Sequence, residues 1–233
     1  MSLNKINVPS VKEAFVQELE NKILSGEFAI GEKLPTAREL CSLMGVSLTI
    51  VNAGMSELAV KGFVEIKPRC GTYVADYRTN GTPETMIAVF RYNGGKLNPH
   101  DVRSFCESRI AMDPFVAKLV IERASNEQLD ELRPLVEKLH AEREMEPFCT
   151  TILEFFRRLY QLSGNIVFSL LYKSTLEPQR GMYAVFIEKN GFDIVDGYVD
   201  MIYKLLLERD VAGVQKCLIE SMQLPLSGDT SIV

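Results

Sequence analysis

Cationic and small polar side chains recur between residues 33 and 69 in a pattern that suits nucleic acid. Lysine and arginine neutralise phosphates, and asparagine on a projecting helix suits adenine. The candidate residues are Lys33, Arg38, Ser47, Thr49, Asn52, Lys67 and Arg69. Two alternatives stay open at this point: helix packing for Thr49 and Asn52, and a solvated hairpin tip for Lys67 and Arg69.

Side chains suited to catalysis or metal binding are few and scattered. No CxxC pair occurs, and His100 and His140 are the only histidines. The sequence holds no clustered nucleophile and base and no glycine-rich phosphate loop, so it predicts a protein that is not an enzyme and has no metal and no cofactor. Each cysteine reads as a small buried hydrophobe or a surface thiol. The cysteines are Cys41, Cys70, Cys106, Cys149 and Cys217.

The elements that would position the candidate contacts are three helices and a hairpin. Apolar residues recur every four positions from Val11 to Ile23, which predicts a helix that ends near Gly26. Thr36 and Glu39 form a capping box for a helix over Thr36 to Met44. Gly45 ends that helix, and Ser47 is the N-cap of the next, over Leu48 to Val60.

Two short β-rich runs follow, separated by a proline and glycine turn, and they predict a hairpin. Helix, helix pair and hairpin in this order indicate a winged helix-turn-helix, in which the second helix of the pair enters the major groove. A helix pair with a hairpin also occurs as a plain packing unit, and the order of elements alone leaves that alternative open.

The remaining chain shows no strand pattern and is typical of an antiparallel helical bundle. The fold class we predict is mostly α, with an N-terminal winged helix-turn-helix and a C-terminal all-α bundle. The predicted division is 1–76 for DNA binding, 77–83 as linker, 84–225 for effector binding and dimerisation, and 226–233 as a flexible tail. The predicted helices are 84–92, 101–123, 126–144, 147–162, 166–189, 194–208 and 211–223.

Composition places the chain among soluble globular proteins. It has 233 residues, 46% hydrophobic and 24% charged, with a formal net charge of -5. Disorder and low complexity are excluded, and no apolar run reaches the length of a membrane span. We therefore expect a cytoplasmic protein without membrane contact. Residues 1 to 78 hold 9 Lys+Arg and 9 Asp+Glu, so the excess acid lies entirely beyond them.

Four motifs of the first part together resemble the GntR family of bacterial transcription regulators. They are Gly26–Leu40, Gly45–Ser47, Gly62–Val64 and Gly71–Val74. The resemblance implies that Arg38, which follows the Leu-Pro turn, contacts DNA. The family's recognition helix usually carries arginines where this chain has Leu48 and Asn52. An operator richer in A and T is one interpretation, and weakened DNA binding is the other.

The second part resembles the helical effector-binding domain of the FadR subfamily, known as the FCD type. Glu107-Ser108-Arg109, Met112-Asp113-Pro114 and Ser163-Gly164-Asn165 carry this likeness. Many members bind a divalent metal through one aspartate and three histidines. Their places fall on Ile152, Phe156, Val199 and Ser221, so the resemblance predicts a pocket without metal and with Phe156 as an apolar floor.

The resemblance also implies that Arg109 projects into the effector pocket and pairs with a carboxylate. A buried salt bridge with a neighbouring acid, such as Asp113 one turn later, is the alternative. Arg180 could hold an anionic ligand or belong to a solvated helix face. We therefore predict Arg109, Asp113, Phe156 and Arg180 as effector contacts.

Two functions follow from these residues. The first is a ligand-responsive transcription regulator that binds a near-palindromic, double-stranded DNA operator as a homodimer, with a small, anionic and partly apolar effector. The second is a small-molecule binding protein whose DNA-reading surface has decayed. It is motivated by the missing arginines at Leu48 and Asn52.

Overall fold

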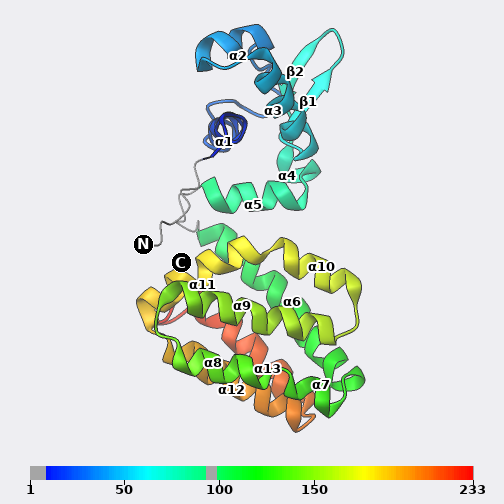
Figure 1. Ribbon diagram of the computed structural model, residues 1–233, viewed down its shortest axis with the longest axis vertical. Coiled ribbons are helices and arrows are strands. Elements are labelled where there is room, and N and C mark those ends of the chain that lie inside the picture. The colour runs from blue at the N-terminus through cyan, green and yellow to red at the C-terminus, as the bar shows by residue number, and fades with distance from the viewer. Residues whose placement is uncertain (1–8, 93–98, 233) are drawn as a thin grey trace, which may run out of the picture. The chain divides into compact units, whose positions relative to one another are not determined.

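The computed structural model describes residues 9–92 and 99–232. The chain divides into two compact units, Met1–Gly94 and Gly95–Val233 (Figure 1). Each unit has its own hydrophobic core. Unit 1 holds five helices and one hairpin within the described residues, and unit 2 is helical throughout its described length. The predicted fold class is therefore confirmed.

Unit 1 begins with three helices whose ends are fixed by their caps. Thr36 accepts a hydrogen bond from the backbone of Glu39, whose side chain binds back to the Thr36 backbone, and Gly45 has a left-handed φ of 65°. The predicted capping box and helix end are thus confirmed, as is Ser47 as the next N-cap. The three helices are α1 (Val11–Leu24), α2 (Ala37–Met44) and α3 (Leu48–Val60).

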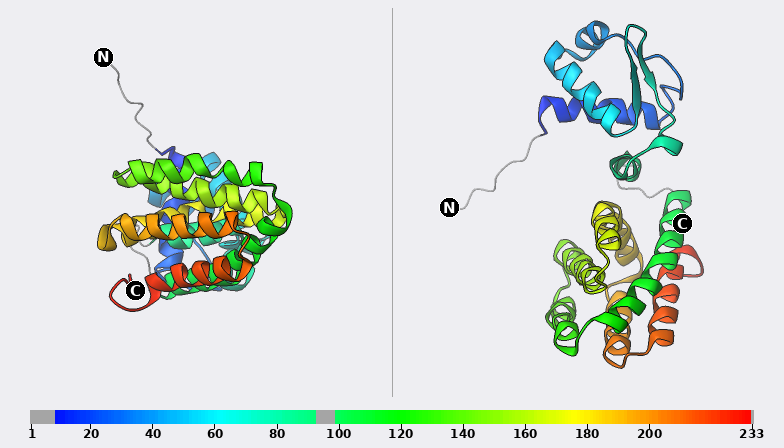
Figure 2. Two further views of the ribbon diagram at one scale, coloured as in Figure 1. Left: turned by 90° about the horizontal axis from the view of Figure 1, so that it is seen from below. Right: turned by 90° about the vertical axis from the view of Figure 1, so that its right-hand side faces the viewer.

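The hairpin consists of β1 (Val64–Lys67) and β2 (Gly71–Val74), whose two strands lie side by side (Figure 2). The strands pair antiparallel, with Lys67 opposite Gly71. Close packing between α1 and α3 anchors the unit, because a Cβ on Gly54 would lie 2.4 Å from Cδ1 of Phe15. Phe15 and Leu58 are buried in this core. The absence of a side chain at Gly54 therefore sets how closely the two helices approach.

The predicted linker differs from the structure. Tyr77–Asn80 form a short helix, α4, and α5 (Pro83–Tyr92) packs in the core of unit 1 through Ala88 rather than opening the second unit. The hydroxyl of Thr85 donates to the carbonyl of Lys61, which ties α5 to the end of α3. The polar composition of residues 77–83 suggested a linker, but local hydrogen bonds fold it into helix ends.

Unit 2 is a bundle of helices that run side by side (Figure 2). Its core is formed by residues from α6 to α13, including Phe148, Phe155, Leu159 and Tyr160. The helices are α6 (Pro99–Arg123), α7 (Asn126–Asp130), α8 (Arg133–Ala141), α9 (Met145–Leu162), α10 (Ile166–Ser174), α11 (Leu176–Asn190), α12 (Asp193–Leu207) and α13 (Val211–Gln223).

Two helices predicted as continuous are each broken into two. Pro134 lies in the first turn of α8, and Pro178 lies in the first turn of α11. A proline has no backbone N–H to continue a helix from the preceding turn but is tolerated at a helix start. The predicted helices 126–144 and 166–189 therefore end and restart near residues 132 and 175.

The predicted flexible tail folds back on α11. A short 3-10 helix, Leu224–Leu226, follows α13. The side-chain amide of Asn190 donates to the Thr230 carbonyl at 3.1 Å, and the Ile232 N–H donates to the Pro225 carbonyl at 2.9 Å. Residues 227–232 are thus held against the bundle, and residue 233 lies outside the described residues.

Within the described ranges, no single helix is both long and apolar enough to cross a membrane. The bent pair α2 and α3 meets the length and composition criteria together, with an angle of 112° between its halves.

Candidate nucleic-acid interface and ligand cavity

The outer face of α3 carries the residues predicted to contact bases. Thr49 and Asn52 are exposed, and Leu48 beside them is 48% exposed. Val51 and Leu58 are buried on the opposite face, so α3 is held by one side and free on the other. The Ser47 hydroxyl accepts the Ile50 N–H at 3.4 Å, which uses this predicted contact as a helix cap.

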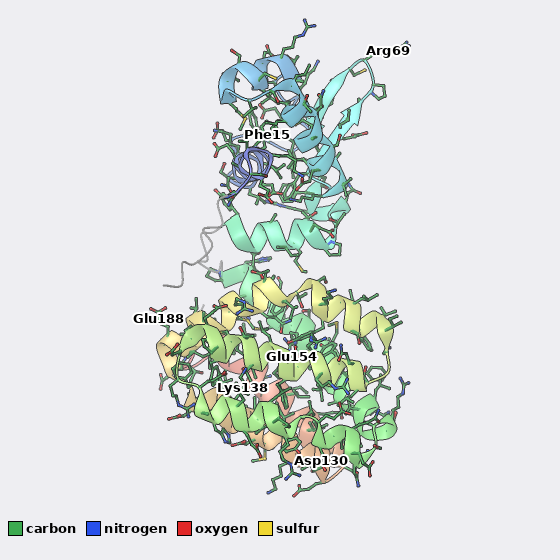
Figure 3. The ribbon with its side chains drawn as sticks, viewed as in Figure 1. Phe15, Arg69, Asp130, Lys138, Glu154 and Glu188 are labelled. Atoms are coloured by element: carbon green, nitrogen blue, oxygen red, sulfur yellow. The ribbon has the colours of Figure 1, made fainter. Side chains whose placement is uncertain are left out.

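The predicted cations lie on three elements of unit 1. Arg38 is exposed on α2, and Arg69 lies at the tip of the hairpin (Figure 3). Among the residues that the structure describes, neither arginine forms an ion pair. Arg69 has a left-handed φ of 63° in a turn closed by the Cys70 N–H and the Lys67 carbonyl at 3.0 Å. Its charge is therefore held at the end of the wing.

Tyr73 on β2 lies beside two of the predicted cations, and the sequence pattern did not single it out. The Nζ atoms of Lys33 and Lys67 lie 5.9 and 5.1 Å from the centre of its ring. Lys67 also lies 3.2 Å from a carboxylate oxygen of Glu65. The aromatic face attracts both ammonium groups and gathers them on one side of the wing. Lys33 reaches Tyr73 because the two residues form a backbone bridge at the edge of the sheet, which the sequence does not indicate.

In unit 2, Arg109 and Asp113 form a buried ion pair on α6. Each is 1% exposed. Arg109 Nε donates to the two Asp113 oxygens at 2.8 and 2.7 Å, and Nη2 lies 2.6 Å from Oδ2. Burial alone lowers the pKa of Arg109, but the Asp113 carboxylate overrides it and raises the pKa well above its ordinary value. The alternative interpretation of Arg109, a buried salt bridge, is the one the structure contains.

Side chains from three other helices complete the surroundings of this pair. Gln179 of α11 accepts from Arg109, and the Tyr160 hydroxyl of α9 donates to Asp113. The Arg109 guanidinium carbon lies 5.0 Å from the centre of the Phe156 ring and 5.3 Å from that of Tyr172. The ion pair is thus enclosed by protein groups from α9, α10 and α11.

The other predicted effector cation lies elsewhere. Arg180 Nη1 donates to a Glu146 oxygen at 2.6 Å and to the Thr150 hydroxyl at 3.1 Å. Its side chain is 31% exposed. The structure therefore brings Arg109, Asp113 and Phe156 together and leaves Arg180 in a separate ion pair with α9.

A cavity of about 40 Å³ lies next to Phe156 between α9, α11, α12 and α13. All four positions that the family resemblance assigned to metal ligands line it, namely Ile152, Phe156, Val199 and Ser221. The other lining residues are Met182, Tyr183, Phe186, Ile194, Val195, Tyr198, Ile202, Met222, Leu224 and Pro225. Within the described chain, no group of three or more His, Cys, Asp or Glu side chains could hold a metal ion.

The cysteines divide by burial. Cys106, Cys149 and Cys217 are buried in unit 2, and burial raises the pKa of each thiol to about 11. Cys41 is half-buried on α2, and Cys70 is exposed next to Arg69. A thiol with a raised pKa stays protonated at neutral pH and reacts slowly.

The element order, the exposed face of α3 and the cationic wing define a winged helix-turn-helix joined to an all-helical unit with an internal cavity. Residues 11–74 match the family described as bacterial regulatory proteins, gntR family, and residues 104–224 match the FCD domain. The chain belongs to the GntR family and carries an FCD domain as its second unit. Regulators of this family bind DNA, and FCD domains bind small-molecule effectors.

Relatives of known name agree with this assignment. The HTH-type transcriptional regulator Mce2R of Mycobacterium tuberculosis is 29% identical over 75% of this chain and 72% of its own. The HTH-type transcriptional repressor NanR of Cronobacter sakazakii is 26% identical over 72% of this chain and 64% of its own. The solved structure of Lar, described as controlling the Listeria monocytogenes agr system, has a TM-score of 0.64 at 16% identity. It covers 97% of this chain and 98% of its own, and it shows the shared fold.

Proposed function

We propose that the protein is a ligand-responsive transcription regulator that binds a near-palindromic operator as a homodimer. The observation that carries the proposal is the exposed face of α3, where Thr49 and Asn52 are free to reach base edges. The cations Lys33, Arg38, Lys67 and Arg69 surround it on neighbouring elements and suit phosphates. Two copies related by a two-fold axis would read two half-sites.

The effector would bind in the cavity lined by Phe156, and the Phe156 ring would contact it. Arg109 and Asp113 are paired with each other and do not line the cavity, so they would act indirectly, by supporting the Phe156 side of its wall. Binding that favours one arrangement of the two DNA-reading units over another changes operator affinity, and by linkage the operator changes effector affinity equally. With operator DNA as its partner, the protein would act in the cytoplasm.

The second candidate, a small-molecule binding protein with a decayed DNA-reading surface, is favoured by one observation. Leu48 exposes an apolar side chain at the start of α3, where a cation would strengthen binding. The two candidates share the cavity and differ in whether specific DNA binding occurs.

Fluorescence anisotropy with the DNA upstream of the protein's own gene separates them. At low salt we expect binding that exceeds that of a scrambled duplex of equal length. Asn52→Ala is expected to relax the base preference by about 1–3 kcal/mol at one position of each half-site, because a bidentate contact is lost. Asn21→Ala, on α1, serves as the matched control. Equal affinity for the upstream and scrambled DNA would reject the regulator and favour the decayed surface.

A further inference from the structure

The wall of the helical-unit cavity has a distinct chemistry. None of its lining side chains carries a charge, and the lining residues that have a hydroxyl group are Tyr183, Tyr198 and Ser221. The Ser221 hydroxyl donates its proton to the Leu218 carbonyl at 2.9 Å, so that proton is already used within α13. The rest of the wall is aliphatic, aromatic or thioether.

The nearest buried cation is not available to an anion in this cavity. Arg109 lies behind Phe156 and is neutralised by Asp113 at 2.6 Å. A carboxylate placed among these residues would lose its hydration without gaining an unpaired cation, which is a large cost. The cavity therefore selects against anions.

Tyr183 differs from the other buried tyrosines around Arg109. The Tyr160 hydroxyl donates to Asp113, and the Tyr172 hydroxyl donates to the Leu153 carbonyl at 3.2 Å. Tyr183 is only 6% exposed, and its hydroxyl makes no hydrogen bond to any residue that the structure describes. The hydroxyl oxygen itself is not fully enclosed, so a small molecule can reach it. Burial raises the pKa of Tyr183 to about 12, so its hydroxyl keeps its proton at neutral pH. Buried phenols normally have an acceptor.

The cavity also has parts that can move. Its volume of about 40 Å³ holds only a few atoms, but Met182 and Met222 line it. Methionine is unbranched with three rotatable bonds, so it adapts its shape more easily than leucine or isoleucine. A ligand larger than water can enter when these two side chains change rotamer.

We propose that this cavity binds an uncharged, largely apolar molecule with one hydrogen-bond acceptor, to which the Tyr183 hydroxyl donates. The inference rests on the proposed effector role of the cavity and replaces the anionic effector that the sequence suggested. Tyr183 is the residue that gives specificity, and Phe156 and the methionines supply the apolar contact.

Isothermal titration calorimetry of the full chain at pH 8 tests this with three probes of similar size. The probes are 2-heptanone, which offers one acceptor, n-hexane, which offers none, and heptanoate, which is anionic. We expect 2-heptanone to bind at least tenfold more tightly than heptanoate. Tyr183→Phe is expected to weaken 2-heptanone binding about three- to tenfold, as for the loss of one hydrogen bond, and to leave n-hexane binding unchanged. Tyr203→Phe, a tyrosine outside the cavity, is the matched control.

Tighter binding of heptanoate, no binding of 2-heptanone up to its solubility limit, or equal 2-heptanone affinity in wild type and Tyr183→Phe would each overturn the proposal. Operator anisotropy with the same probes separates this failure from failure of the proposed function. If 2-heptanone binds through Tyr183 but leaves operator affinity unchanged, the ligand class stands and the regulatory coupling falls. If heptanoate alone changes operator affinity, the regulator stands and the ligand class falls.

Discussion

Arg109 and Asp113 neutralise each other in the interior of unit 2, where each is 1% exposed. Removing one partner leaves the other charge buried without compensation. We expect Arg109→Ala to lower the free energy of unfolding by about 3–5 kcal/mol. Urea denaturation followed by circular dichroism measures the change. The double variant Arg109→Met with Asp113→Leu removes both charges and is expected to lose less than the single variant. A loss under about 1 kcal/mol for Arg109→Ala would contradict the buried ion pair.

The four cavity positions to which the family resemblance assigned metal ligands carry two aliphatic side chains, a phenyl ring and a hydroxyl here. Zinc and nickel prefer imidazole, thiolate and carboxylate ligands. We expect tag-free protein to retain no more than traces of either metal after dialysis. Inductively coupled plasma mass spectrometry measures the content. One zinc or nickel ion per chain, retained against buffer without chelator, would be the contrary result.

Single residues show how far the sequence carries a site prediction. The caps at Thr36 and Ser47 were predictable because they act on their own helices. Arg109 had two possible roles, and only its enclosure by α9, α10 and α11 distinguishes them. Tyr73 was missed because its contact with Lys33 arises only in the fold, and the proposed role of Tyr183 depends on a cavity formed by four separate helices. Arg180 was assigned to the effector, but its geometry pairs it with Glu146.

At the scale of elements, the wing combines a charge with a strained backbone. Arg69 adopts φ of 63°, a region that costs a non-glycine residue about 1–2 kcal/mol. Arg69→Gly relieves this strain but adds freedom to the unfolded chain, so we expect a net gain in stability of up to about 1 kcal/mol. It also removes the proposed phosphate contact, which should lower the slope of log affinity against log salt by about 0.9 per half-site.

Thermal unfolding and operator anisotropy between 50 and 200 mM salt check the two effects of this wing variant separately. Arg69→Lys keeps the charge and is the matched control for the slope. An unchanged slope in Arg69→Gly would mean that the wing tip does not touch phosphate.

Helices α1 and α3 share an ion cluster that makes unit 1 sensitive to acid. Glu57 lies 2.9 Å from both Lys12 and Lys61, and Lys61 lies 2.9 Å from Glu20. Hydrogen bonds from Lys12 and Lys61 lower the pKa of Glu57 below its ordinary value of 4.5. A carboxylate whose pKa is lower in the folded state stabilises it fully above 4.5, and this stability is lost as pH falls through the folded pKa.

We therefore expect the melting temperature of unit 1 to fall below pH 4.5, and to fall less steeply in Glu57→Gln. Differential scanning calorimetry from pH 3 to 7 measures both. Glu188→Gln, at an exposed site in unit 2 (Figure 3), is the control. Identical acid limbs in wild type and Glu57→Gln would refute the role of the cluster.

The element boundaries show that apolar periodicity and polar composition by themselves do not fix where helices begin and end. Helical periodicity continued through residues 126–144 and 166–189, but the prolines at 134 and 178 restart the helix in each case. Residues 77–83 have a linker composition, yet α5 beyond them packs Ala88 into the core of unit 1. The periodic, well-capped helices α2 and α3 needed no such contacts and were predicted closely.

At the scale of the whole molecule, the gntR-family domain and the FCD domain lie in two units with separate cores. One copy presents one recognition helix, so a near-palindromic operator calls for two copies. We expect sedimentation equilibrium to give about twice the chain mass of 26.2 kDa. Operators with half-site centres one helical turn apart, about 34–36 Å, should bind most tightly. A monomer at micromolar concentration with full operator affinity would exclude the dimer.

The distribution of thiols provides a way to test whether ligand changes the distance between the two wings of a dimer. Cys70 is exposed at the wing tip, whereas the three cysteines of unit 2 are buried with thiol pKa values raised to about 11. With the half-buried Cys41 replaced by serine, a maleimide fluorophore would attach selectively to the wing. Energy transfer between the two wings of a dimer would then report how far apart they lie, with and without ligand. Cys70 is thus a labelling site in the natural sequence at which the proposed effect of ligand on the wings can be measured.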